Sequence, residues 1–321
     1  MIEKKRFFIF GSILIAVIVA SMVFMPQLTK TQTKMEKPVV SVSTFSLYES
    51  AKAVGGDAVD VRSIVPLGSD AHMFSPNPSH VAELSKSALF VYNGAGFESW
   101  AEGMKKSLPS SVKAIDMSRY AVLLKSEHDE GHDAEHTDDH GEHAHGVYDP
   151  HYWLDIDNMI KMTQTLETEF SKVLPEKAPL FHQNAAAYIA ELQKLKSQYV
   201  SGLAECQNRT LVSNHDAFGY LAHANKLEAV SVIGLSSDEQ PSAKTMAHIV
   251  EVVKEHKMKT IFFEELINDN VSQTIARETG AKAVPLQPLE NISEDELKSH
   301  QSYLSIMREN LTKLREAMEC R

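Results

Sequence analysis

Short apolar stretches alternate with longer, helix-like stretches along most of the chain. Residues 39–43, 59–65 and 88–92 are rich in β-branched and other apolar residues, which is typical of buried strands. Between the first two, apolar residues recur at helical spacing and stop at Gly55-Gly56, a common helix end. Strands that alternate with helices predict parallel sheets and an α/β fold.

The same order of features occurs in both halves of the chain. Each half has a strand that leads into a loop of Gly, Ser and Asp, then a Pro-Ser helix start, a helix and another strand. These features occupy 61–92 in the first half, with Asn77 as a helix cap before Pro78. In the second half they occupy 230–263, with 260–263 as the last strand. We therefore expect two similar α/β lobes.

One long helix is predicted between the lobes, from about residue 176 to residue 205. Apolar residues recur there at three- and four-residue steps, so the helix would be roughly 45 Å long and would span both lobes. Two shorter helices with a break are the alternative. We accordingly expect an amino-terminal lobe over 38–175, a connecting helix over 176–206 and a carboxy-terminal lobe over 207–321.

The first 25 residues have the pattern of an export signal. Lys4, Lys5 and Arg6 precede an almost unbroken apolar run, 7–25, and a polar linker follows over 26–37. The run is near the lower limit for crossing a bilayer, so it is either cleaved or retained as an anchor. We expect the protein outside the cytoplasm, in a periplasm or at the outer face of the membrane.

The bulk composition is that of a globular protein. Of the 321 residues, 43% are hydrophobic, and this length suits two domains of ordinary size. The formal net charge of -11 argues against a general nucleic-acid partner.

Much of this negative charge comes from residues 127–146. The stretch contains eight Asp and Glu residues and no Lys or Arg, and it also contains six histidines: His128, His132, His136, His140, His143 and His145. It has too few apolar residues to form a core, so we expect it to be disordered. It is interpreted as a weak, multivalent metal-collecting loop; the alternative is a solvated insertion with incidental metal affinity.

The two cysteines, Cys206 and Cys320, are expected to form a disulfide. An isolated pair in an exported chain tends to become oxidised, and the bond would hold the carboxy-terminal helix in place. Thiolate ligands of a metal are the alternative interpretation.

Three histidines follow strand candidates in loop-like contexts: His72, His151 and His215. Open α/β sheets bind ligands at the carboxyl ends of their strands, and imidazole is a preferred zinc ligand. A single histidine in such a place is more often a hydrogen-bonded loop residue. The other histidines outside 127–146 fall in helical patterns and are expected at the surface: His80, His182, His223, His248, His256 and His300.

The segments around these histidines resemble those of ZnuA-type and TroA-like solute-binding proteins of metal ABC importers. They are Gly-Ser-Asp-Ala-His (68–72), Asp-Pro-His-Tyr-Trp-Leu-Asp (149–155), Ser-Asn-His-Asp-Ala-Phe-Gly-Tyr (213–220) and Pro-Leu-Gln-Pro-Leu-Glu (285–290). The resemblance covers about residues 38–320. It implies two lobes joined by one long helix, with His72, His151 and His215 binding a metal between them.

The fourth ligand is open to alternatives. The resemblance places Gln287 where many members have Asp, and Glu290 matches the members that use Glu. Water or another loop donor could replace it, and Glu290 could instead be an acid at a helix start. Three imidazoles and one carboxylate favour Zn²⁺ over manganese. Other groups are expected to orient the imidazoles, with Asp155 and Asp216 nearest in sequence.

The sequence therefore predicts a zinc-binding protein that delivers Zn²⁺ to the membrane permease of an ABC importer, acting as a monomer and not as an enzyme. A manganese- or iron-binding member of the same family is one alternative. A zinc hydrolase with an open fourth position is another, although the chain has no His-Glu-x-x-His motif. A surface adhesin or a periplasmic zinc buffer is a third.

Overall fold

The computed structural model describes residues 36–126, 148–235, 241–264 and 270–321. The predicted export signal, most of the linker and the whole histidine-rich stretch lie outside the described residues. From Lys37 onward the chain forms one unit, which contains both predicted lobes. Among the described residues, no helix combines the length and the apolar composition that crossing a membrane requires.

The amino-terminal lobe is built on a four-stranded parallel sheet with the order β2-β1-β3-β4. All four residues of β3 are buried, as expected for a strand with both faces covered. The helix α3 starts as predicted, because the Asn77 side chain accepts hydrogen bonds from the backbone N–H groups of Ser79 and His80. The elements are β1 (Val39–Val42), α2 (Phe45–Gly55), η1 (Gly56–Ala58), β2 (Asp60–Ser63), α3 (Pro78–Leu84), β3 (Leu89–Tyr92), α4 (Ala101–Ser107), β4 (Lys113–Asp116), η2 (Met117–Tyr120), η4 (Tyr152–Leu154) and α5 (Ile156–Val173).

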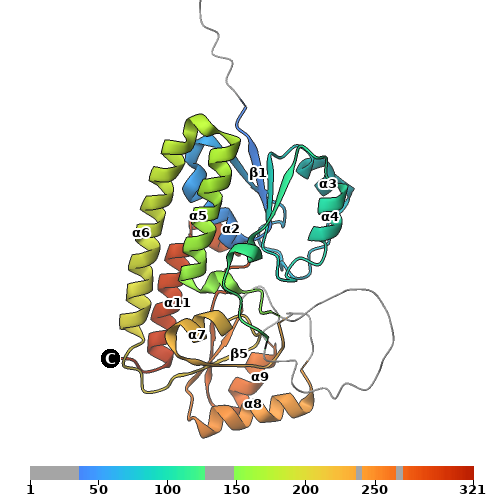
Figure 1. The fold of residues 1–321 in the computed structure, drawn as a ribbon. Helices are drawn as coiled ribbons and strands as arrows, with labels where there is room; N and C mark the ends of the chain where they lie inside the picture. Colours follow the sequence, from blue (N-terminus) through green and yellow to red (C-terminus); the bar gives the residue numbers. More distant parts are fainter. Residues whose placement is uncertain (1–35, 127–147, 236–240, 265–269) are drawn as a thin grey trace, which may run out of the picture. The chain divides into compact units, whose positions relative to one another are not determined.

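The carboxy-terminal lobe repeats this arrangement with the order β6-β5-β7-β8, again parallel throughout. Its elements are β5 (Thr210–Ser213), α7 (Gly219–Asn225), β6 (Glu228–Ser231), α8 (Ala243–Glu255), β7 (Thr260–Phe263), α9 (Asn270–Thr279), β8 (Lys282–Pro285), α10 (Glu294–Lys298) and α11 (Tyr303–Ala317). The prediction of two similar α/β lobes is confirmed (Figure 1).

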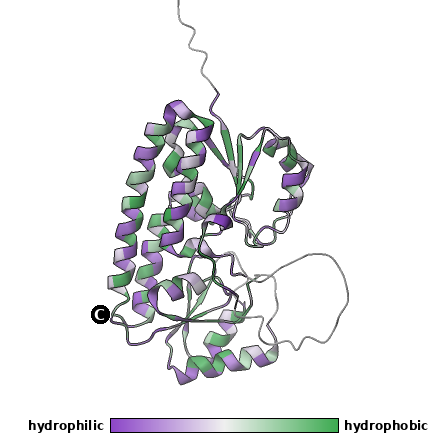
Figure 2. Cartoon of the chain, viewed as in Figure 1, coloured by the Kyte–Doolittle hydropathy of each residue, from purple (hydrophilic) through white to green (hydrophobic). Residues whose placement is uncertain are grey.

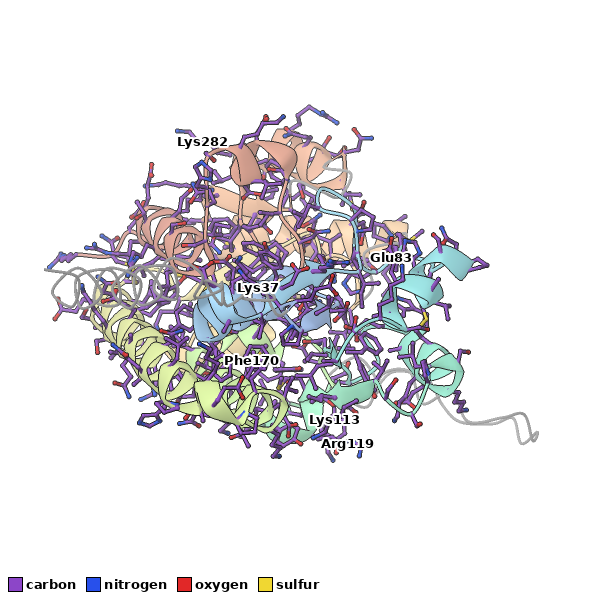
Figure 3. The ribbon with its side chains drawn as sticks, turned by 90° about the horizontal axis from the view of Figure 1, so that it is seen from above. Lys37, Glu83, Lys113, Arg119, Phe170 and Lys282 are labelled. Atoms are coloured by element: carbon purple, nitrogen blue, oxygen red, sulfur yellow. A yellow bond between two sulfur atoms is a disulfide. The ribbon has the colours of Figure 1, made fainter. Side chains whose placement is uncertain are left out.

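The helix between the sheets is continuous, so the alternative of two shorter helices is wrong. It begins after the short turn η5 (Pro175–Lys177) and runs as α6 (Ala178–Gly202), which is 25 residues and roughly 37 Å long. Polar and apolar residues alternate along α6 in Figure 2, and its buried residues pack on α2, α5 and α11. Phe170 of α5, labelled in Figure 3, packs edge-on against Phe181 of α6 at 5.7 Å between ring centroids.

The predicted disulfide joins Cys206 to Cys320 and so fastens the chain after α6 to the chain after α11. Because both sulfurs are committed to this bond, the interpretation of the cysteines as thiolate metal ligands is wrong for the chain in this state.

Among the residues that the structure describes, the buried apolar side chains form three clusters. The largest joins the amino-terminal sheet to α2, α5, α6, α7 and α11, and it includes Leu286, Leu289 and Ile292 from the segment after β8. A second cluster lies within the carboxy-terminal lobe, under α8 and α9, and a third lies under α3 and α4. The segment after β8 therefore shares its core with the other lobe, which matters for the site below.

Candidate metal centre

His72 lies in the loop that follows β2. The Asp70 side chain accepts a hydrogen bond from the His72 backbone N–H at 2.9 Å, which shapes this loop locally. The imidazole packs against the ring of Phe97 at 4.6 Å between centroids. Its Nε2 lies 3.2 Å from Glu290 Oε1, a residue 218 positions later in the chain.

His151 is completely buried in the turn before η4. One oxygen of Asp149 accepts from both the backbone N–H of His151, at 2.9 Å, and its ring Nδ1, at 2.8 Å. The rings of Phe97 and Trp153 pack around the imidazole at 6.1 and 5.4 Å between centroids. The orientation of this ring is thus fixed by a carboxylate and by its aromatic neighbours.

His215 lies two residues after the end of β5 and is also completely buried. Its Nδ1 lies 2.5 Å from Glu264 Oε1, and its Nε2 lies 2.9 Å from the carbonyl oxygen of Leu235. Glu264 follows β7, so two neighbouring strands place the imidazole and the carboxylate at the same edge of the sheet. A carbonyl oxygen only accepts hydrogen bonds, so in this arrangement Nε2 carries a hydrogen.

Glu290 is the residue of the final motif that joins the histidines. Its Oε1 lies 3.2 Å from Nε2 of His72 and 3.0 Å from Nε2 of His151. The preceding residue, Leu289, has a φ of 64°, a left-handed conformation that is unfavourable for a leucine. Gln287 points elsewhere, because its side-chain amide donates to the carboxylate of Glu296.

The four predicted ligands meet in one place. One potential ligand atom from each of His72, His151, His215 and Glu290 can be chosen so that all lie within 4.8 Å of one another. The imidazole centroids are 5.0 to 5.6 Å apart. Ligand atoms around a tetrahedral zinc are separated by roughly 3.4 Å, so small inward shifts would complete a coordination sphere.

The Nε2 atom of His151 is a direct indication that the cluster suits a cation. This atom is fully buried, and the Glu290 carboxylate, 3.0 Å away, is not well aligned for a hydrogen bond with it. A metal ion placed between the two groups would bind both the nitrogen and the carboxylate. The donor set of imidazoles and a carboxylate is the set that zinc prefers.

Electrostatics hold extra protons on these rings when no metal is bound. Burial alone would lower the pKa of His151, but its hydrogen bond to Asp149 and the nearby Glu290 carboxylate outweigh burial and raise the pKa to about 10. At His215, burial would again lower the pKa, but the Glu264 carboxylate outweighs burial and raises the pKa to about 9. Burial would raise the pKa of Glu290, but His72 and His151 hold it well below its usual range.

A small pocket adjoins the cluster. It is lined by residues of both lobes: Asp70, Ala71, Glu264, Gln287, Pro288, Glu290 and Asn291. The carboxylates of Glu264 and Glu290 both border it, so the charge around the three imidazoles is negative on this side.

Two residues that hold the imidazoles were missed by sequence reasoning. Asp149 bonds to the His151 ring and Glu264 to the His215 ring. Asp155, one of the two acids nearest in sequence, instead caps α5. A signal for Glu264 was available, because it follows the strand candidate 260–263 directly. Of the histidines expected at the surface, five are exposed and His80 is half-buried within the cap of α3.

The sequence comparisons find one family and several named relatives. The family model described as "Zinc-uptake complex component A periplasmic" (ZnuA) matches residues 40–317. "Zinc-binding protein AdcA" of Streptococcus pyogenes serotype M3 is 34% identical over 314 residues, which are 94% of this chain. The chain spans only 61% of the length of that relative. "High-affinity zinc uptake system protein ZnuA" of Bacillus subtilis is 32% identical, and the match covers 89% of both chains.

Solved structures share the fold. The Zn(II)-bound ZnuA-like domain of Streptococcus pneumoniae AdcA has a TM-score of 0.74 and 31% identity, over 88% of this chain and 99% of that one. A laminin-binding protein of Streptococcus agalactiae, described as bifunctional with adhesin and metal-transporting activity, has a TM-score of 0.76 and 28% identity over 88% of this chain and 99% of that one.

Proposed function

The chain belongs to the family of zinc-uptake components of the ZnuA type, and we propose that it captures one zinc ion with His72, His151, His215 and Glu290. The observation that carries this proposal is the meeting of four zinc-type donors from four separate loops at one buried point. Bringing three imidazoles and a carboxylate together in a buried place costs desolvation, and binding of a metal ion would offset that cost.

Zinc is the proposed cargo because of the donor types. Three imidazoles and a single carboxylate suit Zn²⁺, whereas manganese prefers sites richer in oxygen. The names of the relatives in S. pyogenes and B. subtilis support the same metal. A site that favours manganese would need a further carboxylate at the ion, and Asp70 and Glu264 are the carboxylates that border the pocket beside Glu290.

Binding without turnover is the proposed activity. A zinc hydrolase keeps one coordination position for water and substrate. Here the Glu290 carboxylate lies within 3.2 Å of two imidazoles, so it occupies the side of the cluster on which such a water would bind. We infer that the ion is enclosed by protein side chains and handed on unchanged.

The proposed partner is the membrane permease of an ABC importer, reached outside the cytoplasm. The positively charged start and the apolar run 7–25 favour export, and a relative in S. pneumoniae is named a zinc-binding lipoprotein. The histidine-rich stretch 127–146 would collect zinc beside the main site. Surface adhesion is a second candidate role, favoured by the shared fold with the laminin-binding protein of S. agalactiae.

Calorimetric titration of the purified chain with Zn²⁺ tests the proposal. His151→Ala should lower zinc affinity by about tenfold or more, because the sphere loses a ligand. The matched control is His182→Ala, which removes an exposed histidine that pairs with Glu167 on the surface of α6. Equal affinity of the wild type and the His151 variant would remove His151 from the site. A crystal grown with zinc, with anomalous data at the zinc edge, would identify the ion and its ligands.

A further inference from the structure

The segment that carries Glu290 belongs to one lobe by sequence and to the other by contact. It follows β8 of the carboxy-terminal sheet, and the Gln287 backbone still bonds to Asn310 of α11. The backbone carbonyls of Pro288, Glu290 and Ile292 instead bond to groups of the amino-terminal lobe. The N–H of Phe45, at the start of α2, donates to the Glu290 carbonyl oxygen at 2.8 Å. The Gly68 N–H donates to the carbonyl of Ile292 at 2.8 Å, and the Trp153 indole donates to the carbonyl of Pro288 at 2.7 Å.

Asn291 joins this segment to the loop of His72. Its side-chain amide donates both hydrogens to that loop, to the carbonyl oxygens of Pro66 at 2.8 Å and Ser69 at 2.7 Å. The residue is 4% exposed, so these two bonds are shielded from water. One side chain thereby fixes the distance between the neighbours of two metal ligands.

The apolar side chains of this segment lie in a core that both lobes share. Leu289 and Ile292 are completely buried in the cluster that includes residues of α2, α5 and α6 as well as Leu211 and Phe218 of the carboxy-terminal lobe. The N-terminus of α11 is held to α2, because Glu49 accepts a hydrogen bond from the Tyr303 N–H. The division between the lobes therefore rests on the hydrogen bonds.

His215 is held differently. Its two ring partners, Glu264 and the carbonyl of Leu235, both lie in the carboxy-terminal lobe, as does the strand β5 that carries it. Its own backbone carbonyl accepts from the Ser213 hydroxyl of the same strand. Every hydrogen bond described for this residue therefore stays within its own lobe.

We propose that the four ligands divide three and one: His72, His151 and Glu290 form a preassembled half-site on the amino-terminal lobe, and His215 alone completes it from the other lobe. This inference rests on the proposed function. Asn291 is the positioning residue of the half-site, because it fixes the His72 loop to the Glu290 segment. Two imidazoles and a carboxylate suffice to hold Zn²⁺ with water in the fourth position, so the half-site receives the ion first.

The division predicts an unequal response to loss of a histidine. His215→Ala leaves three ligands that are already in place, whereas His72→Ala leaves ligands on two lobes that the metal must hold together. We expect His215→Ala to retain zinc binding, with an affinity at least about tenfold higher than that of His72→Ala, a difference of about 1.4 kcal/mol. Competition with a chromophoric zinc chelator at fixed pH measures both.

Asn291 is tested by combining substitutions. Asn291→Ala should lower zinc affinity by about tenfold in the wild type and in the His215→Ala background. In the His72→Ala background it should have less than about a threefold further effect, because the ligand that it positions is absent. A purely structural role would instead lower affinity equally in both backgrounds.

Asn158→Ala is the matched control. Asn158 is also buried and also makes two side-chain bonds to backbone, both to Val122, away from the ligands. It should lower the unfolding temperature comparably to Asn291→Ala and leave zinc affinity unchanged. Asn291→Leu, which keeps the volume without the donors, repeats the test if the alanine variant does not fold.

The outcomes separate this inference from the proposed function. A wild-type chain that binds no zinc would overturn both. A wild type that binds zinc, with His72→Ala and His215→Ala equally weakened, would overturn the division into three and one while leaving the zinc site in place. An Asn291→Ala effect of equal size in the two histidine backgrounds would remove Asn291 as the positioning residue.

Discussion

The two sheets have the same strand order, but they hold their histidines by different means. In the amino-terminal lobe, His151 bonds to Asp149, two residues earlier in the same turn, and Phe97 and Trp153 confine its ring. In the carboxy-terminal lobe, His215 bonds to Glu264, 49 residues away and directly after the neighbouring strand β7. The aromatic neighbours described for the His215 ring are only the other two histidines of the site.

The difference shows that one site combines a local and a long-range way of fixing a ring. His151 keeps its aromatic neighbours even when its carboxylate is removed. His215 depends on the pairing of β5 with β7, because that pairing alone brings Glu264 within reach. The carboxy-terminal ligand should therefore be the more sensitive of the two.

The largest expected effect comes from the disulfide, the covalent link that fastens the start of the carboxy-terminal lobe to the end of the chain. Replacing Cys206 and Cys320 with Ser should lower the free energy of unfolding by about 2–5 kcal/mol, because the unfolded chain gains freedom. Zinc affinity should remain within about threefold, since the β5–β7 pairing does not include either cysteine.

Denaturant unfolding and zinc competition on the same samples measure the two quantities. Reduction of the wild type by a thiol reagent should reproduce the double substitution. If zinc affinity fell together with stability, the position of His215 would depend on the disulfide as well as on the β5–β7 pairing. The difference between the two lobes would then not be explained by Glu264 alone.

The next effect compares the two carboxylates directly. Glu264→Ala should lower zinc affinity by about 10–100-fold, because His215 loses the group that orients its ring. Asp149→Ala should lower it less, since Phe97 and Trp153 still confine His151. Calorimetry gives both affinities.

The control is Glu167→Ala, which removes a similar carboxylate partner from the exposed His182 at 2.9 Å. It should leave zinc affinity unchanged, because solvent already surrounds that pair. A larger loss of zinc affinity for Asp149→Ala than for Glu264→Ala would mean that His151 depends more on its carboxylate than His215 does.

The contrast between local and long-range contacts also explains which features could be predicted from the sequence. The strand 260–263 is predicted with its bounds, because a run of apolar residues bounded by polar ones specifies it locally. The edge strands β4 and β8 were not predicted separately, since they are partly exposed and begin with lysine. The connecting helix is shorter than expected and ends at Gly202, where a side chain would meet Arg315 and Leu311 of α11.

The metal site shows the same difference between local patterns, which the sequence predicts, and long-range contacts, which it does not. The four proposed ligands could be predicted because their motifs are local and resemble those of a known family, and the structure brings these four residues together. The bond from Glu264 to His215 and the bonds from Asn291 to the His72 loop depend on which segments become neighbours in space. No periodicity or local motif encodes such contacts, so the sequence predicts the ligands better than the groups that position them.

Zinc affinity should depend on pH, because His151 and His215 each carry a proton that zinc displaces. The pKa values of His151 and His215, raised to about 10 and about 9, keep both rings protonated between pH 6 and pH 8 without metal. A metal-bound nitrogen carries no proton, so zinc must displace it, and a lower pH favours the proton. Affinity should therefore fall with falling pH, by about tenfold per pH unit for each proton released.

Asp149→Asn removes a charge that raises the pKa of His151, and Glu264→Gln does the same at His215. Each should flatten the slope of log affinity against pH, which titrations at pH 6, 7 and 8 measure. His182→Ala, at the surface, should leave the slope unchanged. A wild-type affinity independent of pH over this range would show that neither ring carries a displaced proton.

The smallest expected effect on the tight site comes from the histidine-rich stretch. The residues that flank it are side by side, because Lys125 pairs with Tyr148 and the Asp149 N–H donates to the carbonyl of Leu124 at 3.0 Å. Replacing 127–146 with Asn-Gly would close this pair with a short turn at little entropic cost. The tight zinc affinity should change by less than about threefold, while the number of weakly bound zinc ions should fall.

Calorimetry resolves the tight site and the weak sites. Loss of the tight site would place it in the deleted stretch, and unchanged weak binding would mean that these histidines do not collect metal. The His151 ring is held by Asp149 and by its aromatic neighbour Trp153, and not by residues 127–146. His151 should therefore keep its position when those 20 residues are removed.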